Sequence, residues 1–253
     1  SRALQLAEHG LYSTDPNPRV GCVLVKEDVV IGEGWHAVAG GPHAEIVALQ
    51  QAGEAARGAT AYVTLEPCCH HGKTPPCSEA LIEAGVAKVI AAMEDPNPRV
   101  AGEGLKQLQQ AGIEVASGLL QTQAEALNPG FVQRMRSDRP FIRSKLAMSV
   151  DGRTAMASGE SKWITGEAAR RDVQHLRARS SAIMSGIGTV LADDPSLTVR
   201  TVSGELAERQ PLRVILDPHL STPETARFLS QPGQSFIVTA AEEPEIQERL
   251  EQA

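Results

Sequence analysis

The sequence predicts an α/β protein with two domains. Short β-rich runs alternate with helix-forming stretches, and a charged segment that ends in proline interrupts this alternation near residue 138. A second βα series follows the interruption. Alternation of this kind is typical of a sandwich in which a mixed sheet carries helices on both faces. The length of 253 residues suffices for two domains of ordinary size.

The first domain is expected to span residues 1–138. Five β-rich runs predict its strands, and the turn-like pair Glu27-Asp28 joins the first two runs into a hairpin. These strands are expected at residues 20–25, 29–31, 61–65, 86–93 and 113–115. Helix-forming composition, with glycine as a stop signal after the last two, predicts helices at residues 43–56, 78–84 and 103–111.

The second domain is expected to span residues 139–253 and to follow a linker at residues 134–140. Its predicted helix covers residues 167–179, with Thr165 as the capping residue. Its βα series is expected to use strands within residues 141–150, 182–185, 212–216 and 235–239. The sequence stops inside or just after a helix-like acidic segment, so we expect this domain to be incomplete here.

Composition narrows the class of protein. Hydrophobic residues make up 42% and charged residues 22%, which is typical of a globular chain and excludes wholesale disorder. The sequence contains no apolar run of membrane-spanning length and no secretory signal, so we expect a soluble, intracellular protein of the cytoplasm. The net charge of −7 argues against a protein that coats nucleic acid.

Charge is distributed unevenly along the chain. Residues 139–200 carry 10 lysines and arginines against 6 acidic residues, whereas both flanking regions are acidic. Such a basic segment could serve a phosphorylated ligand, although a solvated helix face is the commoner explanation of such an excess.

The strongest chemical signal is a set of metal-ligand residue types. His43, Cys68 and Cys77 supply one imidazole and two thiolates, and a catalytic zinc site needs three protein ligands and an open position for water. Glu45 follows the histidine by two residues at a helix start, where it could reach the water without binding the metal. Helix N-termini near the cysteines would favour the thiolate forms. The pattern therefore predicts a catalytic Zn²⁺ centre with Glu45 as its proton-transfer residue.

The spacing of the two cysteines leaves alternatives to this ligand set open. The known zinc-deaminase pattern has two residues between its cysteines, whereas eight separate them here. The intervening residues include Cys69, His70 and His71, which could also bind a metal. A structural zinc would need a fourth ligand and would leave Glu45 without a role, and an ordinary cluster of reduced thiols is the third interpretation. Cys22 lies in an apolar run and is expected to be a core residue.

A short motif occurs twice, and two further polar residues are candidates for substrate contacts. Asp-Pro-Asn-Pro-Arg-Val stands at residues 15–20 and again at residues 95–100. The copies are either two similar turns or two loops at the ligand-binding edge of one sheet. Asn17 could hydrogen-bond a base or sugar edge or simply cap its turn. Lys73 could meet a substrate phosphate or be an ordinary exposed lysine.

The glycine pair Gly186 and Gly188 follows a short predicted strand. Glycines at such a place let backbone N–H groups approach a phosphate. The third glycine of the dinucleotide-binding fingerprint is missing, so a Rossmann domain is disfavoured.

Several of these motifs together resemble the bifunctional deaminase/reductase family of riboflavin biosynthesis. The resemblance covers essentially the whole chain, at residues 14–21, 43–45, 67–77, 145–155, 161–165 and 186–200. It implies a cytidine-deaminase-like fold for the first domain, which would hydrolyse an amino group from a phosphoribosylamino-diaminopyrimidine. It implies a dihydrofolate-reductase-like second domain that uses NADPH to reduce the ribosyl group to ribityl, with further strands beyond Ala253.

The resemblance also implies roles for individual residues. His43, Cys68 and Cys77 match the zinc ligands of the family, and Glu45 matches its proton-transfer residue. The positions that would contact the cofactor are Ala147, Trp163, Thr189 and Asp193. The positions that would surround the ribosyl phosphate are Ser161, Arg177, Leu197 and Arg200. Apart from the resemblance, an ordinary solvated helix face is the expected explanation for three other arginines, namely Arg170, Arg171 and Arg179.

Two other functions compete with this one. A nucleobase or transfer-RNA deaminase with an accessory domain would favour the shorter cysteine spacing, a basic surface and more aromatic residues than the 3% present. A zinc-stabilised interaction module leaves Glu45 unexplained. The expected partner is therefore a small phosphorylated pyrimidine, without nucleic acid or membrane, and a homo-oligomer is left open.

Overall fold

The computed structural model describes residues 1–71 and 75–252. The chain divides into two compact units, residues 1–143 and residues 144–253, and each is described by itself. Among the described residues, no helix combines the length and the apolarity that crossing a membrane requires. The domain boundary expected at residue 138 stays a prediction.

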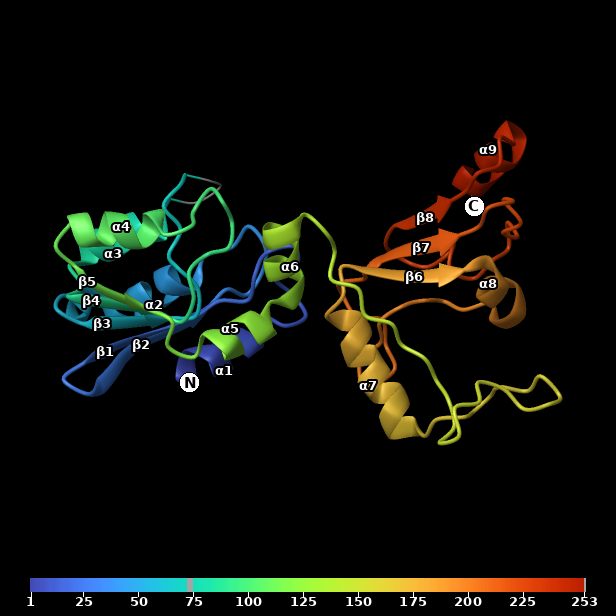
Figure 1. Cartoon of the computed structure of the whole chain (residues 1–253), viewed down its shortest axis with the longest axis horizontal. Coiled ribbons are helices and arrows are strands. Elements are labelled where there is room, and N and C mark those ends of the chain that lie inside the picture. The colour runs from blue at the N-terminus through green and yellow to red at the C-terminus, as the bar shows by residue number, and fades with distance from the viewer. Residues whose placement is uncertain (72–74, 253) are drawn as a thin grey trace. The chain divides into compact units, whose positions relative to one another are not determined.

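The first unit is built on one five-stranded mixed sheet. Its order is β2-β1-β3-β4-β5, with β1 antiparallel to β2 and β3, and with β3, β4 and β5 parallel (Figure 1). The strands are β1 (Gly21–Lys26), β2 (Val29–Trp35), β3 (Thr60–Val63), β4 (Lys88–Ala91) and β5 (Glu114–Ser117). The predicted hairpin and the predicted mixed sheet are thus confirmed.

Helices cover both faces of this sheet, as predicted. Figure 1 shows α3 and α4 on one side of the strands and α1 and α5 on the other. The period-2 alternation of β1 explains this arrangement, because Cys22 and Leu24 belong to one core cluster and Val23 packs with α1 in another. The helices are α1 (Arg2–Glu8), α2 (Ala44–Ala52), α3 (Cys77–Ala84), α4 (Glu103–Gln110), α5 (Gln121–Leu127) and α6 (Pro129–Ser137), and a 3₁₀ turn (Gly53–Ala56) follows α2.

Two glycines of β2 determine how closely α2 approaches the sheet. A Cβ atom at Gly34 would lie 2.3 Å from the carbonyl oxygen of Ala44, and one at Gly32 would lie 2.3 Å from that of Ala48. A side chain at either position would push the helix away from the sheet. The close approach sets the position of the α2 N-terminus, where His43 is the N-cap residue.

The predicted linker at residues 134–140 is wrong over most of its length, because α6 continues to Ser137. Pro129 is tolerated in the first turn of this helix, since that position has no intrahelical partner for an N–H group. Val132 is buried, and the side chain of Asn128 pairs with both backbone groups of Arg19 at 2.8 and 2.9 Å. Long-range docking therefore orders a segment that looks like a linker locally.

The second unit contains a three-stranded parallel sheet of order β6-β7-β8. One face of this sheet packs against a core that includes Val190, Leu197 and Phe228. The strands are β6 (Ala182–Gly186), β7 (Leu212–Leu216) and β8 (Ser235–Val238), and the helices are α7 (Glu167–Ala178), α8 (Ile187–Asp193) and α9 (Pro244–Gln252).

Two sequence expectations fail in this unit. Residues 139–166 contain no helix or strand, so the strand expected within 141–150 does not form. Its apolar side chains find no sheet partner, and Ile142 is 81% exposed. The N-cap of α7 is Gly166 and not Thr165, whose carbonyl instead accepts a hydrogen bond from Arg170 Nη1 at 2.6 Å.

Candidate functional site

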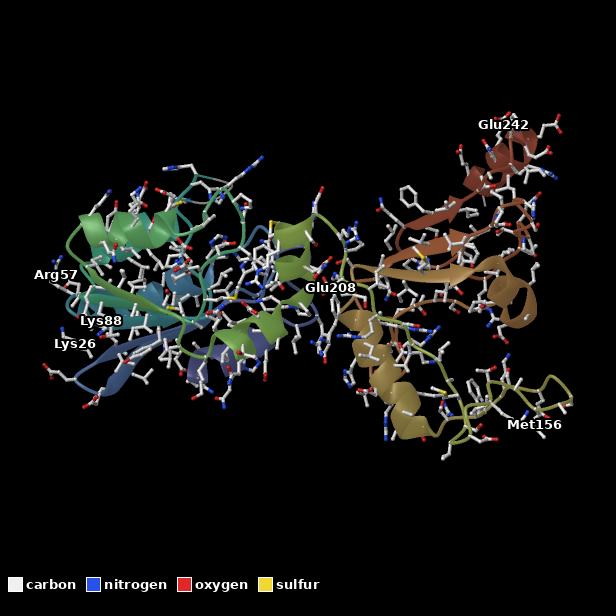
Figure 2. The ribbon with its side chains drawn as sticks, viewed as in Figure 1. Lys26, Arg57, Lys88, Met156, Glu208 and Glu242 are labelled. Carbon is white, nitrogen blue, oxygen red and sulfur yellow. The ribbon has the colours of Figure 1, made fainter. Side chains whose placement is uncertain are left out.

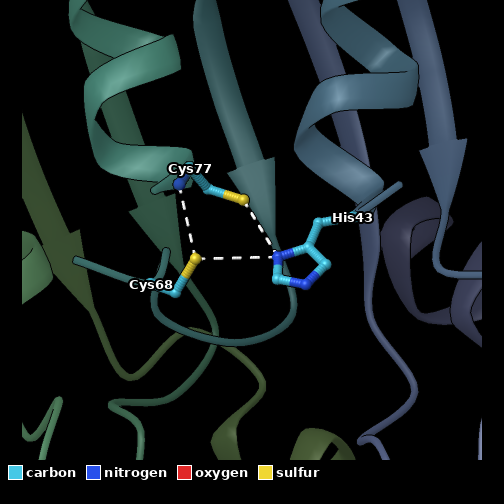
Figure 3. Close-up of side chains that lie close together, drawn as sticks. All are labelled: His43, Cys68 and Cys77. Carbon is cyan, nitrogen blue, oxygen red and sulfur yellow. Dashed lines mark hydrogen bonds between the residues drawn. The ribbon is translucent and has the colours of Figure 1, made fainter. Parts of the chain in front are cut away.

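Three separate segments bring His43, Cys68 and Cys77 together at one edge of the first sheet (Figure 3). His43 caps α2, Cys68 follows β3 in a loop, and Cys77 is the first residue of α3. His43 Nδ1 lies 3.2 Å from Cys77 Sγ and 3.6 Å from Cys68 Sγ. All three potential ligand atoms lie within 4.8 Å of one another, and no other such group of His, Cys, Asp and Glu occurs in residues 1–71 and 75–252.

This arrangement fits a tetrahedral zinc ion. Zinc–sulfur bonds of about 2.3 Å and zinc–nitrogen bonds of about 2.0–2.1 Å place nitrogen and sulfur about 3.6 Å apart in a tetrahedron. The two nitrogen–sulfur distances of 3.2 and 3.6 Å are close to that value. Cys77 is buried, whereas His43 and Cys68 are half-buried, so one side of the group faces outward.

The protonation of Cys68 and Cys77 favours binding of a cation by their sulfur atoms. A hydrogen bond from the Cys77 thiol lowers the pKa of Cys68 to about 4, and the Cys77 backbone N–H and His43 add to this effect. The Cys77 backbone nitrogen lies 3.3 Å from Cys68 Sγ. The same contact with Cys68, together with burial, raises the pKa of Cys77. The pair therefore retains one proton, which a divalent cation would replace. Cys68 is not itself in a helix, but its sulfur lies at the α3 N-terminus.

Glu45 lies in the first turn of α2, beside the three ligand residues. Its side chain is only 3% exposed, and this burial raises the pKa of the carboxyl group to about 7. The carboxyl group interacts with the Cys77 thiol. A group with these properties can hold a proton and release it near neutral pH.

His36 is a site residue that the sequence interpretation missed. It directly follows β2 and is buried, and its ring meets the His43 ring edge-on at a centroid distance of 5.3 Å. His36 Nε2 lies 3.0 Å from Asn17 Nδ2, and His36 Nδ1 lies 2.9 Å from the Pro42 carbonyl oxygen. Burial lowers the pKa of His36, which favours the neutral ring that can accept from Asn17 and donate to Pro42. A lone histidine after a strand offers no sequence signal of this role.

Both copies of the repeated motif lie at the metal edge of the sheet. The first copy leads into β1, whose Gly21 exchanges hydrogen bonds with Thr64 at the end of β3, and the second copy follows β4. In the second copy, burial raises the pKa of Asp95 to about 6, and this carboxyl group interacts electrostatically with Cys68. Lys26, Arg57 and Lys88 lie together at the other end of the sheet (Figure 2).

The other residues near the cysteine pair do not join the metal group. His71 lies 3.7 Å from Glu79 in an exposed pair, and Cys69 is half-buried outside the group. Cys22 is fully buried in the core between the sheet and its helices, as expected. Lys73 lies outside the described residues.

The residues assigned to the reductase lie on several segments of the second unit. Trp163 is 73% exposed, and the Arg170 guanidinium covers its ring at 4.5 Å. Lys162 Nζ lies 3.7 Å from Asp193 Oδ1, which connects the segment before α7 to α8, the helix that also carries Thr189. Ala147 is half-buried and Ser161 is exposed, both in the irregular segment 139–166.

The residues assigned to the ribosyl phosphate differ in which of their groups can reach a ligand. Arg177 Nη1 donates to the Thr198 carbonyl at 2.9 Å, and Arg200 is exposed, with Nη1 3.0 Å from the Gly204 carbonyl. The side chain of Leu197 lies in the core, so only its backbone can reach a ligand.

The arginines assigned to a solvated helix face do not all lie on one. Arg171 is exposed beside Glu167, as expected, whereas Arg170 and Arg179 are half-buried. The assignment was wrong for these two residues, because Arg170 stacks on Trp163 and Arg179 lies at the α7 C-cap.

Comparisons with known proteins match both halves of the chain. The family model of the cytidine and deoxycytidylate deaminase zinc-binding region matches residues 1–93, and that of the RibD C-terminal domain matches residues 140–252. These matches confirm the deaminase and reductase domains that the resemblance implied.

Curated relatives and solved structures agree with the family models. The riboflavin biosynthesis protein RibD of Escherichia coli is 56% identical over 96% of this chain and 69% of its own length, and that of Haemophilus influenzae is 62% identical over 90% and 64%. The Acinetobacter baumannii RibD structure has a TM-score of 0.92 at 55% identity, covering 98% of this chain and 70% of that one. The Thermotoga maritima diaminohydroxyphosphoribosylaminopyrimidine deaminase/5-amino-6-(5-phosphoribosylamino)uracil reductase has a TM-score of 0.88 at 42% identity, covering 96% and 69%.

The chain thus spans about two-thirds of the length of the relatives that it matches. It belongs to the RibD family of riboflavin biosynthesis proteins, enzymes that join a Zn²⁺-dependent deaminase domain to an NADPH-dependent reductase domain.

Proposed function

We propose that this chain removes an amino group from a phosphoribosylamino-diaminopyrimidine by hydrolysis and then reduces the ribosyl group of the product to ribityl with NADPH. The observation that carries this proposal is the group of His43, Cys68 and Cys77 beside the buried carboxyl group of Glu45, within the region that matches the zinc-binding deaminase model. The two activities for which the Thermotoga maritima protein is named support the choice of substrate.

In the deaminase step, His43, Cys68 and Cys77 hold the metal. When bound, Zn²⁺ supplies Lewis-acid activation of water. Glu45 accepts a proton from the attacking water and delivers it to the exocyclic nitrogen, so that water is consumed and ammonia leaves. Asn17, oriented by His36, presents its amide to the pyrimidine, and Lys73 is assigned to the substrate phosphate.

In the reductase step, the proposed cofactor contacts are Ala147, Trp163, Thr189 and Asp193. The ribosyl phosphate is assigned to the remaining reductase positions, which are Ser161, Arg177, the backbone of Leu197 and Arg200. Cationic side chains and backbone N–H groups suit a phosphate. The deaminase activity is assigned to residues 1–138 and the reductase activity to residues 139–253.

The proposal also covers cellular context. Two cysteines gathered with a histidine as proposed metal ligands suit a reducing compartment, which supports the cytoplasm as the proposed location. The partner is a small phosphorylated pyrimidine and not a nucleic acid, and self-association into a homo-oligomer stays a prediction. The rival nucleobase or transfer-RNA deaminase is not favoured, because residues 140–252 match the RibD C-terminal domain.

Metal dependence tests the proposal directly. We expect the purified chain to bind one Zn²⁺ and to release ammonia from the phosphoribosylated diaminopyrimidine, and we expect a chelator to abolish this release. Cys77→Ala should lose the metal, whereas Cys69→Ala is the matched control and should retain it. Zinc retained at full occupancy in Cys77→Ala would overturn the ligand assignment in favour of Cys69, His70 or His71.

A further inference from the structure

The three proposed ligands differ in how the backbone holds them. His43 and Cys77 lie at the first turns of α2 and α3, where helical hydrogen bonds determine their positions. Cys68 lies in a loop. A loop position needs other contacts if it is to be ready for a metal, because an unsupported ligand would lose conformational entropy on binding.

One set of contacts reaches Cys68 through Ser78. The Cys68 carbonyl oxygen accepts from the Ser78 backbone nitrogen at 3.1 Å, and Ser78 Oγ lies 3.0 Å from the same oxygen. Ser78 is fully buried, and its hydroxyl group also lies 2.5 Å from Gln107 Oε1 on α4, the shorter of its two contacts. Because the hydroxyl group has a single proton, it donates to Gln107 Oε1, and the backbone N–H of Ser78 makes the bond to Cys68. The carbonyl group of Cys68 is therefore connected through Ser78 to the middle of α4.

A second set of contacts reaches the segment before Cys68 through Glu66. This side chain is only 3% exposed, and Oε1 accepts from the backbone nitrogens of Gly104 and Leu105 at 2.8 and 3.2 Å. Oε2 accepts from the backbone nitrogens of Gly102 and Asp95 at 2.9 and 3.0 Å. The carboxylate thus binds the N-terminus of α4 together with the loop that leads to it, an arrangement that the helix dipole also favours.

Close packing adds a third constraint on the same segment. A Cβ atom at Gly104 would lie 2.1 Å from the carbonyl oxygen of Pro67, the residue directly before Cys68. The first turn of α4 therefore rests on the peptide group that leads into the ligand. No side chain larger than hydrogen fits between them.

We propose that α4 is the element that positions Cys68 for the metal, with Glu66 and the pair Ser78 and Gln107 as its positioning residues. Glu66 attaches the first turn of α4 two residues before the ligand, and Gln107 acts through Ser78 on the ligand's own carbonyl group. The two connections therefore join the segment at Cys68 to α4 at two places, the first turn and the middle of the helix. This inference rests on the proposed zinc centre and deepens it.

Glu66 is suited to this role by its charge as well as its shape. Each of its two oxygens accepts two N–H groups. In Glu66→Gln, an NH₂ group replaces one oxygen and faces two donors, so two hydrogen bonds are lost with almost no change of volume. Gln107→Leu is similar in size and removes the acceptor that faces Ser78.

The test uses the full chain and a readout other than activity. Glu66→Gln and Gln107→Leu are expected to bind zinc about 10- to 100-fold more weakly in competition with a chelator, the usual effect of losing a group that orients a metal ligand. Substitution with Co²⁺ should show a shifted thiolate-to-metal absorption band in both variants. Glu103→Gln and Gln110→Leu alter exposed side chains of the same helix and should match the wild type in both measurements.

The outcomes separate this inference from the proposed function. Wild-type zinc affinity and an unshifted Co²⁺ band in folded Glu66→Gln and Gln107→Leu would overturn the positioning role and leave the zinc centre intact. A wild-type chain without zinc would overturn the proposed function and this inference with it. If Glu66→Gln does not fold by circular dichroism, Gln107→Leu decides the matter, because its side chain is only half-buried.

Discussion

The two units hold their functional residues in different ways. In the first unit, helices cover both faces of the sheet, and buried polar side chains such as Glu45, Glu66 and Ser78 converge at one edge of it. In the second unit, one face of the parallel sheet carries the core, and apolar side chains of the other face are 43–64% exposed, namely Met184, Leu216, Phe236 and Val238.

Buried polar residues also differ in purpose between the units. The guanidinium of Arg213 is fully buried and donates to the backbone carbonyls of Gln231, Pro232 and Gly233 and to Ser235 Oγ. It holds a loop and lies outside the proposed contacts. The proposed reductase contacts Trp163 and Arg200 are exposed. This difference indicates that the activity of a buried, preorganised centre depends on each of its groups. Exposed side chains instead contribute to ligand binding in smaller, separable amounts.

The largest expected effect tests the preorganised centre. Glu45→Gln should retain zinc and fold but lose deamination by about 10²- to 10⁴-fold, the usual scale for a positioned proton-transfer group. Reduction of pre-deaminated substrate with NADPH should continue at nearly the wild-type rate. Ammonia release and NADPH oxidation measure the two steps separately, and Glu83→Gln on the exposed side of α3 is the control. Near-normal deamination would mean that another group transfers the proton.

A smaller effect is expected from an exposed contact of the second unit. Arg200→Ala should lower kcat/KM for reduction about 10- to 100-fold, because a charge-assisted hydrogen bond to phosphate contributes about 1.5–3 kcal/mol. Ammonia release should be unchanged. Arg171→Ala, at an exposed position beside Glu167, is the control. If Arg200→Ala or Glu45→Gln removed both activities from folded, zinc-loaded protein, the comparison would fail and a composite site would replace it.

The smallest effect on catalysis is expected from a change at Asn128, which holds the first repeat copy and α6 together. The expected effect is on stability. Its amide pairs with the backbone N–H and carbonyl groups of Arg19. Asn128→Ala leaves both groups without these bonds and should lower the free energy of unfolding of the first unit by about 1–3 kcal/mol. Urea titration measures this change, with the exposed Gln133→Ala as the control. An unchanged midpoint would show that water replaces the amide.

Several features of the fold could be predicted because their signals are local. The alternation in β1, the turn at Glu27-Asp28 and the stop signal at Gly85 act over a few residues, and the structure follows them. The predictions of a linker at residues 134–140 and of a strand within 141–150 were wrong, because contacts with distant parts of the chain decide the structure of both segments. Packing of Val132 orders the first segment, and the second finds no neighbouring strand to pair with.

The candidate site divides in the same way. Residue type and spacing identified His43, Cys68, Cys77 and Glu45, because metal ligation and proton transfer require particular functional groups that few residues carry. His36 was missed, because its relation to Asn17 and to His43 exists only after β2 and the first repeat copy meet at the sheet edge.

By itself, the sequence determined which chemical groups are available and which short segments form strands and helices, since both depend on interactions among near neighbours. Only the tertiary structure decided which groups meet. Cys68 and Gln107 are far apart in the sequence, yet Ser78 joins them, with its backbone N–H bonded to Cys68 and its hydroxyl group to Gln107. Glu66 likewise acquires its four N–H partners from residues 95–105. Such contacts arise from burying polar groups together in a core that satisfies them, and no local pattern records that requirement.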